Sequence, residues 1–319
     1  MVAIAILDDY QQVALQMADW SRLQANHKIT VFSEPFADED AVARALVGFE
    51  VVCLMRERTP FPASLIERLP NLRLIVTSGP QNAAIDVAAA AKKNITVCGT
   101  PSPGHPTAEL TMGLMLSLVR HIHTESAAMR TGGWQTTVGR DLRGQTLGII
   151  GLGRIGGLVT SYARAFGMNV IAWSENLTPQ RCAAVGAEKV EKDDLFRNSD
   201  IITIHTRLSD RTRGLVGARE LALMKPTAYL INTSRGPIID ERALLSALQE
   251  GRIAGAALDV YDHEPLPADH PLRSAPRVLL TPHIGYVTEQ TYRVFYGGMV
   301  EAIEGWLAGK PVGVIQPPA

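Results

Sequence analysis

Cysteine, long apolar runs and net charge are all scarce in this sequence, and each scarcity excludes a class of protein. Only three cysteines occur among 319 residues, at Cys53, Cys98 and Cys182, and no CxxC pair is present. We therefore expect reduced, buried thiols. No stretch of 18 apolar residues occurs, which argues against a membrane-spanning helix. The net charge of -1 gives no overall field that would attract nucleic acid or an anionic membrane.

Targeting and metal-binding signals are missing as well. Residues 1–9 form an apolar, strand-length run closed by two aspartates, without a basic start or a small-residue cleavage site. We therefore expect a cytoplasmic protein. His121 and His123 stand two positions apart on a helical pattern, so they lie on different faces of the helix, which is poor metal geometry. We predict no metal site.

The composition is that of an ordinary globular protein, with 46% hydrophobic and 20% charged residues. Because domains usually run to about 100 to 200 residues, we expect two domains that share a cleft and a small-molecule partner. Short apolar runs alternate with helical patterns from the start, a rhythm typical of βαβ units and a parallel sheet. The first series of expected strands is 2–7, 27–32, 51–55, 74–77 and 96–98, with helices at 38–47 and 63–69.

A stretch rich in proline and glycine, residues 99–106, interrupts this rhythm and marks a domain crossing. A long helix is expected at 107–123, and a second series of strands follows at 146–150, 169–173, 201–205, 228–232, 254–258 and 278–280. A final helix at 288–307, ending before Gly309, is expected to return to the first domain. The sequence thus predicts an α/β fold with one domain of residues 1–99 plus 286–319 and another of residues 100–285.

A glycine-rich turn follows the first strand of the second series. Gly151, Gly153 and Gly156 form a GxGxxG string between the strand 146–150 and a helical pattern at 158–166. In this setting the first glycine permits the tight turn, the second lets a pyrophosphate approach the backbone, and the third lets helix and strand pack closely. The helix N-terminus favours the negative phosphates. We predict that residues 100–285 are a Rossmann-like, dinucleotide-binding domain.

The choice between NAD and NADP depends on the end of the next strand. An acidic residue about twenty positions after the turn would bind the adenosine 2′-hydroxyl and repel a 2′-phosphate. Ser174 stands at that position and Glu175 follows it. Glu175 can disfavour NADP, while Ser174 and the nearby Arg207 can accommodate it. On balance we expect NAD, and Glu175 as a solvated turn residue is the competing interpretation.

Three further strand ends carry polar residues that an inert scaffold would not need. Arg235 follows the strand 228–232, Glu264 follows the strand 254–258, and His283 follows the strand 278–280. Because the carboxyl ends of strands in an open α/β sheet line the ligand crevice, we expect these side chains to converge near the cofactor. Hydride transfer to a carbonyl carbon leaves negative charge on oxygen, which a guanidinium can stabilise and a histidine can protonate.

These motifs resemble the D-isomer-specific 2-hydroxyacid dehydrogenase family, which includes glyoxylate/hydroxypyruvate reductases and phosphoglycerate dehydrogenases. The resemblance covers essentially the whole chain. It implies His283 as the acid/base, Glu264 as its orienting carboxylate, and Arg235 as the clamp on the substrate carboxylate and carbonyl oxygen. It implies a flavodoxin-like substrate domain beside the dinucleotide-binding domain, with the two flanking a cleft. The residues that it implies as dinucleotide contacts are Arg154, Ile155, Thr206, Thr233 and Asp259.

The chemistry of these side chains agrees with the implied roles. A neighbouring carboxylate stabilises the imidazolium form of a histidine, so His283 donates a proton during reduction and accepts one during oxidation. The planar guanidinium of Arg235 binds carboxylate oxygens in pairs, and lysine should be a poor substitute. The sequence therefore predicts hydride transfer between a nicotinamide cofactor and a small D-2-hydroxy acid or 2-keto acid.

The sequence departs from the family in the loop that usually binds the substrate carboxylate through backbone N–H groups. The corresponding residues are 77–86, where we predict that Ser78 and Gly79 contact the substrate. Pro80 contributes no N–H group, and Gln81 stands where a second glycine is common. Arg56, after the third strand, is a candidate for a second anion contact, with a surface charge run as the alternative.

Two alternative functions and one assembly follow from the same resemblance. A dinucleotide-sensing corepressor, as in the C-terminal-binding proteins, keeps the fold, and a related dehydrogenase can act on another small anion such as formate or phosphite. Trp134, in Gly132-Gly133-Trp134, resembles the family segment that helps to pair subunits. The implied assembly is a homodimer, and a loop tryptophan that covers the core is the alternative.

Overall fold

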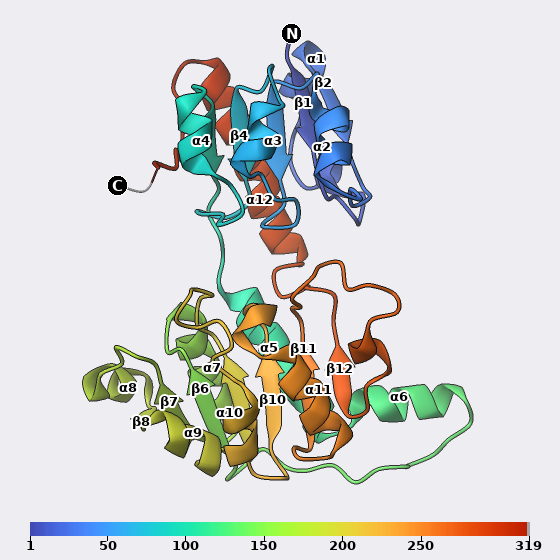
Figure 1. Cartoon of the computed structure of the whole chain (residues 1–319), viewed down its shortest axis with the longest axis vertical. Helices are drawn as coiled ribbons and strands as arrows, with labels where there is room; N and C mark the ends of the chain where they lie inside the picture. Colours follow the sequence, from blue (N-terminus) through green and yellow to red (C-terminus); the bar gives the residue numbers. More distant parts are fainter. Residues whose placement is uncertain (318–319) are drawn as a thin grey trace. The chain divides into compact units, whose positions relative to one another are not determined.

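The computed structural model describes residues 1–317 and divides into two compact units. The first unit consists of Met1–Pro103 and the described residues from Thr288 onward, and the second unit is Gly104–Val287 (Figure 1). The expected crossings lay at 99/100 and 285/286. The first unit extends to Pro103 because the backbone N–H of Thr100 donates to the carbonyls of Thr77 and Gly79.

The first unit is built on a five-stranded parallel sheet in the order β2-β1-β3-β4-β5, the flavodoxin-like arrangement. The strands are β1 (Ala3–Ile6), β2 (Lys28–Val31), β3 (Val51–Leu54), β4 (Leu74–Thr77) and β5 (Thr96–Gly99). The helices are η1 (Ala14–Gln16), α1 (Ser21–Asn26), α2 (Glu39–Leu46), α3 (Ala63–Glu67), α4 (Val87–Lys92) and α12 (Glu289–Leu307).

Buried β-branched and aliphatic side chains form the centre of this sheet, because helices cover both faces of a parallel sheet. All four residues of β3 and all four of β4 are buried. Helix α12 brings Tyr292, Phe295 and Tyr296 into the same core, and the Thr288 side chain caps its N-terminus by accepting the N–H of Thr291. The returning helix therefore belongs to the first unit.

The second unit holds a seven-stranded parallel sheet in the order β12-β11-β10-β9-β6-β7-β8. Its strands are β6 (Thr146–Ile150), β7 (Asn169–Trp173), β8 (Glu188–Lys189), β9 (Ile201–Ile204), β10 (Tyr229–Asn232), β11 (Gly255–Leu258) and β12 (Val278–Leu280). The strand order reverses between β6 and β9, which is the topological switch point of a Rossmann fold. The two predicted parallel-sheet domains are thus confirmed.

Helices connect the strands of the second unit. They are α5 (His105–Val119), α6 (Ile122–Arg130), α7 (Arg154–Ala165), α8 (Pro179–Val185), α9 (Lys192–Asn198), α10 (Ala218–Leu223), η2 (Gly236–Ile238), α11 (Glu241–Gln249) and η3 (Pro271–Ser274). Helix α7 begins at Arg154, directly after the glycine turn, four residues before the helical pattern predicted from Leu158.

Both predicted ends of the long helix expected at 107–123 are wrong. Helix α5 begins at His105, because Pro106 lies in its first turn, where the missing N–H of proline costs no hydrogen bond. It ends at Val119, and His121 adopts a left-handed conformation with φ 53°, which turns the chain into the separate helix α6. Continuous apolar spacing does not show this break.

Candidate active site

The predicted residues of the second unit lie at one edge of its sheet. Because all of its strands run parallel, their carboxyl ends share that edge. Gly151 follows β6, Ser174 follows β7, Thr206 follows β9, Thr233 and Arg235 follow β10, Asp259 and Glu264 follow β11, and His283 follows β12. Strands β10, β11 and β12 are neighbours, so the arginine, the glutamate and the histidine come from adjacent strand ends.

The glycine turn has the geometry that a bound dinucleotide requires. Gly151 has φ +96°, and a Cβ atom there would lie 2.6 Å from the backbone nitrogen of Thr206. A Cβ atom at Gly156 would lie 2.4 Å from the carbonyl oxygen of Gly151. Neither position accepts a side chain, because backbone atoms occupy the space and cannot move aside. These two glycines permit the tight turn and the close packing of α7 on β6.

Gly153 differs from the other two glycines of the motif. It is the N-cap of the twelve-residue helix α7, and a Cβ atom there would meet nothing within 4 Å. The exposed backbone therefore has open space beside it at a helix N-terminus, where a pyrophosphate is favoured. Arg154 is exposed in the first turn, and its guanidinium lies against Gly104 at the start of α5. Ile155, half-buried, follows it.

The residues expected to select the cofactor lie after β7 and β9. Ser174 is half-buried, and its carbonyl accepts the N–H of Leu177 in a turn. Glu175 and Arg207 are both exposed. A negative and a positive side chain are thus available at these two strand ends, so their charges do not decide between a ribose hydroxyl and a ribose phosphate.

His283 and Glu264 form a close pair. The Nδ1 atom of His283 lies 2.5 Å from Oε2 of Glu264, and the two side chains are 21% and 29% exposed. The other carboxylate oxygen, Oε1, accepts the backbone N–H of Tyr261 at 2.9 Å. Both oxygens of Glu264 are therefore engaged, which holds the imidazole in one orientation with Nε2 as the remaining ring nitrogen.

The backbone at His283 is strained and is held in place from Asp259. His283 has φ 52°, in the left-handed region that a non-glycine residue rarely adopts. The buried carboxylate of Asp259 accepts the hydroxyl of Thr281 at 2.6 Å and the N–H groups of Ile284 and Gly285, each at 2.8 Å. Burial raises the pKa of Asp259, and these hydrogen bonds and the charge of His283 oppose the increase. Asp259, predicted as a dinucleotide contact, thus anchors the loop that carries His283.

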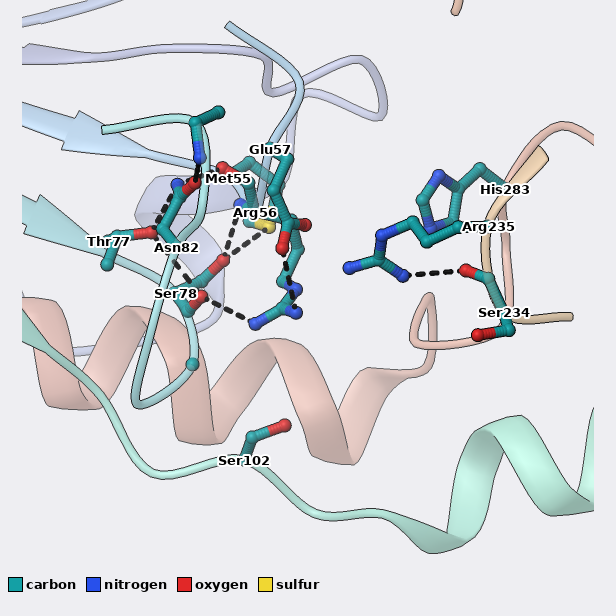
Figure 2. A network of polar contacts seen from close by, with 12 residues as sticks. Met55, Arg56, Glu57, Thr77, Ser78, Asn82, Ser102, Ser234, Arg235 and His283 are labelled. Carbon is teal, nitrogen blue, oxygen red and sulfur yellow. Dashed lines mark hydrogen bonds and ion pairs between the residues drawn. The ribbon is translucent and has the colours of Figure 1, made fainter. Parts of the chain in front are cut away.

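Arg235 extends from a loop that is fixed by its own hydrogen bonds. The side chain of Asn232 donates to the carbonyl of Arg235 and accepts the N–H of Ser234. The hydroxyl of Ser234 donates to the carbonyl of Thr206, which links the ends of β10 and β9. Figure 2 shows the guanidinium of Arg235 folded toward the carbonyl of Ser234, to which Nη1 donates at 2.7 Å.

Two threonines of α5 form hydrogen bonds with residues at the carboxyl ends of the strands. Neither was predicted from the sequence. Thr107 donates to the carbonyl of Gly285 at 3.0 Å, and Thr111 shares a 3.0 Å hydrogen bond with the hydroxyl of Thr233. The signal in the sequence is their spacing of four residues, which places two hydroxyls on one face of the helix. Thr233, predicted as a cofactor contact, is thereby tied to α5.

The predicted substrate loop of the first unit uses two of its backbone donors within that unit. The N–H of Ser78 donates to the carbonyl of Leu54 at 2.9 Å, and the N–H of Gly79 donates to the hydroxyl of Thr100 at 2.9 Å. The contact of Ser78 and Gly79 with a substrate stays a prediction.

Arg56 lies against the same loop. Its guanidinium donates to the carbonyl of Ser78 at 3.0 Å, and its backbone carbonyl accepts the side-chain amide of Asn82 at 2.6 Å (Figure 2). A Cβ atom at Gly79, whose φ is +87°, would clash with this guanidinium. Arg56 is therefore packed into the loop rather than part of a surface charge run, and it brings a cationic group to the carboxyl end of β3.

The three cysteines are free, buried thiols in the core of their units. Burial raises the pKa of Cys53 to about 12 and of Cys98 to about 11, so both are protonated. In the described part of the chain, no three or more histidine, cysteine, aspartate or glutamate side chains gather in a way that could hold a metal ion. Within residues 1–317, no helix combines the length and the apolar character needed to span a membrane.

Comparison with known proteins adds an independent observation. Residues 112–285 match the family described as D-isomer specific 2-hydroxyacid dehydrogenase, NAD binding domain. The chain is 38% identical over 268 residues to a glyoxylate reductase of Aeropyrum pernix, and this match covers 81% of the chain and 79% of that protein. It is 40% identical over 263 residues to a D-3-phosphoglycerate dehydrogenase of Methanocaldococcus jannaschii, covering 81% of this chain and 50% of that protein. It therefore spans about half the length of this second relative.

A solved structure extends the likeness to both units. The phosphoglycerate oxidoreductase from Vibrio cholerae O395 is 36% identical, with a TM-score of 0.92 over 97% of this chain and 100% of that one. The matched family domain contains the glycine turn and the strand ends with Arg235, Glu264 and His283. The glycine geometry fits the nicotinamide dinucleotide that such a domain binds. The chain therefore belongs to the D-isomer-specific 2-hydroxyacid dehydrogenase family.

Proposed function

We propose that the protein reduces a small 2-keto acid to the D-2-hydroxy acid, and catalyses the reverse oxidation, with His283 as the acid/base. The observation that carries this proposal is the 2.5 Å contact between Nδ1 of His283 and Glu264, in a loop anchored by Asp259. A surface histidine does not need a strained backbone and a carboxylate held at both oxygens. Such a geometry suits a group that must hold its proton at one place.

A nicotinamide cofactor held at the glycine turn of Gly151, Gly153 and Gly156 would supply the hydride for reduction and accept it in oxidation. Negative charge develops on the carbonyl oxygen, and Nε2 of His283 donates a proton to that oxygen. Glu264 stabilises the imidazolium before the proton leaves and keeps the ring from rotating. The guanidinium of Arg235 binds the substrate carboxylate and carbonyl oxygen, which fixes the orientation of the reacting carbon.

For the cofactor we propose NAD. Glu175, exposed directly after Ser174, disfavours a 2′-phosphate through its negative charge. Arg207 after β9 is the feature that supports NADP instead. The ratio of kcat/KM for NADH and NADPH measures this preference, and a ratio in favour of NADPH would assign the ribose phosphate to Ser174 and Arg207.

For the substrate we propose a short 2-keto acid, because the relatives include a glyoxylate reductase and a D-3-phosphoglycerate dehydrogenase. A panel of glyoxylate, hydroxypyruvate, longer 2-keto acids and 3-phosphoglycerate, chosen from the names of the relatives, identifies the substrate.

We further propose a homodimer that works in the cytoplasm. Helix α6 has no buried residue, and the segment after it exposes Trp134 by 73% and Val138 by 92%. Large apolar side chains exposed together favour an interface. The dinucleotide-sensing and formate or phosphite alternatives are not favoured, because the relatives are named for hydroxyacid chemistry.

The test of the proposal is His283→Gln. We expect kcat to fall by about two to four powers of ten, as is usual when a general acid/base is removed, while the dissociation constant of NADH stays within about twofold. His270→Gln is the matched control, because His270 also pairs with a carboxylate of the same unit, Glu241, at 3.1 Å. Its kcat should be that of the wild type. A His283→Gln enzyme with nearly normal turnover contradicts the proposed role.

A further inference from the structure

Tyr261 lies between the two strand ends that carry the proposed acid/base pair. It is 8% exposed, three residues after the end of β11. Its hydroxyl lies 3.1 Å from the carbonyl oxygen of Leu258, the last residue of β11, and 2.9 Å from the carbonyl oxygen of Thr281, directly after β12. The single hydroxyl hydrogen is shared between these two acceptors, so the phenol joins β11 to the beginning of the His283 loop.

The same residue also holds the partner of His283. The backbone N–H of Tyr261 donates to Oε1 of Glu264 at 2.9 Å, while Oε2 of Glu264 meets His283. The carbonyl of Thr281 that the phenol contacts accepts the backbone N–H of His283 at 3.1 Å as well. Tyr261 therefore acts on the carboxylate through its backbone and on the histidine loop through its side chain. No other residue described above contacts both sides of the pair in this way.

Two carboxylates and one guanidinium surround the phenol. Asp259 faces it from the end of β11, Glu264 from the loop that follows, and Arg273 from η3. Burial raises the pKa of the Tyr261 phenol, and the two carboxylates raise it further. The hydroxyl therefore remains a donor at every pH at which the enzyme works. This makes the link between the two strand ends permanent rather than dependent on titration.

We propose that the Tyr261 hydroxyl is a positioning group for proton transfer, because it holds the His283 loop at a fixed position relative to Glu264. The inference rests on the proposed function of His283. A residue that acts only on stability would change the unfolding midpoint and leave the chemistry of the folded enzyme unchanged. A positioning residue changes turnover, because a small displacement of the histidine weakens its contact with both Glu264 and the reacting oxygen.

The experiment compares Tyr261→Phe with Tyr229→Phe. The first variant keeps the ring and the backbone N–H and removes only the hydroxyl. Its two acceptors retain the N–H groups of Thr281 and His283, so the fold persists, and unchanged NADH affinity verifies this. We expect about a tenfold fall in kcat, with KM for NADH unchanged. The alkaline limb of the pH–rate profile for keto-acid reduction should move to lower pH, because the imidazolium is less well stabilised. Tyr229, buried at the opposite end of the same sheet, should tolerate the change without loss of kcat.

A double variant separates this inference from the proposed function. If Tyr261 acts through His283, adding Tyr261→Phe to His283→Gln should lower kcat by less than twofold, because the positioned group is already absent. An additional tenfold loss, or a Tyr261→Phe enzyme with wild-type kcat and pH profile, overturns the positioning role. Normal turnover of His283→Gln alone instead overturns the proposed function, so the two failures are distinguishable.

Discussion

The two units place polar residues at the carboxyl ends of parallel strands in the same way and use them differently. In the first unit, Asp8 and Arg56 follow β1 and β3 with φ of 61° and 55°, and in the second unit His283 follows β12 with φ 52°. All three are non-glycine residues in a strained conformation. Asp8 and Arg56 are hydrogen-bonded into their own unit. His283 has one ring nitrogen held by Glu264, and the other is the nitrogen that the proposed function assigns to proton transfer.

This difference teaches that the position after a parallel strand does not by itself define a catalytic group. What distinguishes His283 is that its side chain is 21% exposed and its contact with Glu264 engages only one ring nitrogen. Asp8 is almost completely buried, and Arg56, although 20% exposed, donates to the carbonyl of Ser78. At the carboxyl ends of the strands in the second unit, we therefore expect substitutions to change function more than stability. At the corresponding strand ends of the first unit, we expect substitutions to change stability while cofactor affinity stays constant.

Among the substitutions that test this comparison, the largest effect is expected for Gly153→Ala in the second unit. The added methyl group meets nothing within 4 Å in the protein, so stability should fall only by the cost of alanine at an N-cap, on the order of 1 kcal/mol. It fills the space beside the backbone where the pyrophosphate approaches, so Kd for NADH should rise about tenfold to a hundredfold, or about 1.4 to 2.7 kcal/mol. Fluorescence titration with NADH measures the change.

Gly113→Ala is the control for Gly153→Ala. Gly113 lies exposed within α5, and a Cβ atom there also meets nothing within 4 Å. Its NADH affinity should be normal, with a stability gain of about 0.5 to 1 kcal/mol from the helix preference of alanine. Wild-type affinity in Gly153→Ala would contradict the placement of the pyrophosphate at this helix N-terminus.

An intermediate effect is expected for Asn82→Ala in the first unit. The Asn82 side chain, 6% exposed, donates to the carbonyl of Arg56 and the hydroxyl of Thr77 and accepts the N–H of Ala84. Its removal leaves partly buried backbone groups without these partners and should lower the free energy of unfolding by about 1 to 2 kcal/mol. Urea unfolding measures this, and Kd for NADH should not change.

Asn71→Ala provides the comparison for this variant, because its amide donates to the carbonyl of Val47 at an exposed position. Water replaces that bond, so the loss should stay below about 1 kcal/mol. A large loss of NADH affinity in Asn82→Ala would break the distinction between the two units, and equal losses of stability in the two variants would mean that burial does not set the size of the effect.

The smallest effect is expected for Asp8→Asn and depends on pH. Burial raises the pKa of the Asp8 carboxyl above its ordinary value of 3.8, although Thr59 and Arg58 oppose the increase. The folded protein therefore binds this proton more tightly, so the stability from Asp8 is complete below pH 3.8 and is lost as the pH rises through the raised pKa. Asparagine is neutral and tolerates the left-handed backbone.

For Asp8→Asn we expect no gain in acid and a gain on the order of 1 kcal/mol near neutrality, the usual size of a point-mutation effect. Urea unfolding of both proteins between about pH 4 and pH 8 measures the difference. A constant difference across that range would mean that Asp8 does not titrate between the folded and unfolded states in this way.

The strands and the converging strand ends could be predicted from the sequence because they depend on local patterns. Apolar runs such as 146–150 and 278–280 coincide with strands β6 and β12. Once the sheet is parallel, Arg235, Glu264 and His283 must share an edge, whatever their separation in the chain. The strand β8 was missed because its two residues are exposed at the sheet edge and carry no apolar signal.

Features that depend on tertiary contacts could not be predicted. No pattern indicated that the N–H of Gly79 would be taken by Thr100, or that the phenol of Tyr261 would reach both Leu258 and Thr281. These contacts join segments that only the folded unit brings together. The left-handed His121 is hidden for the same reason, since its apolar neighbours continue the helical spacing.

Helix α12 has a consequence for how the chain is made. The first unit begins at the start of the described chain, yet its core contains Phe295, Tyr296 and Met299, which the ribosome adds only after the whole of the second unit. During translation the second unit has all of its strands before the first unit is complete. Strands β4 and β5, against which α12 packs, keep apolar surface uncovered for that interval. Of the two units, the one whose synthesis begins first is therefore the last to be completed.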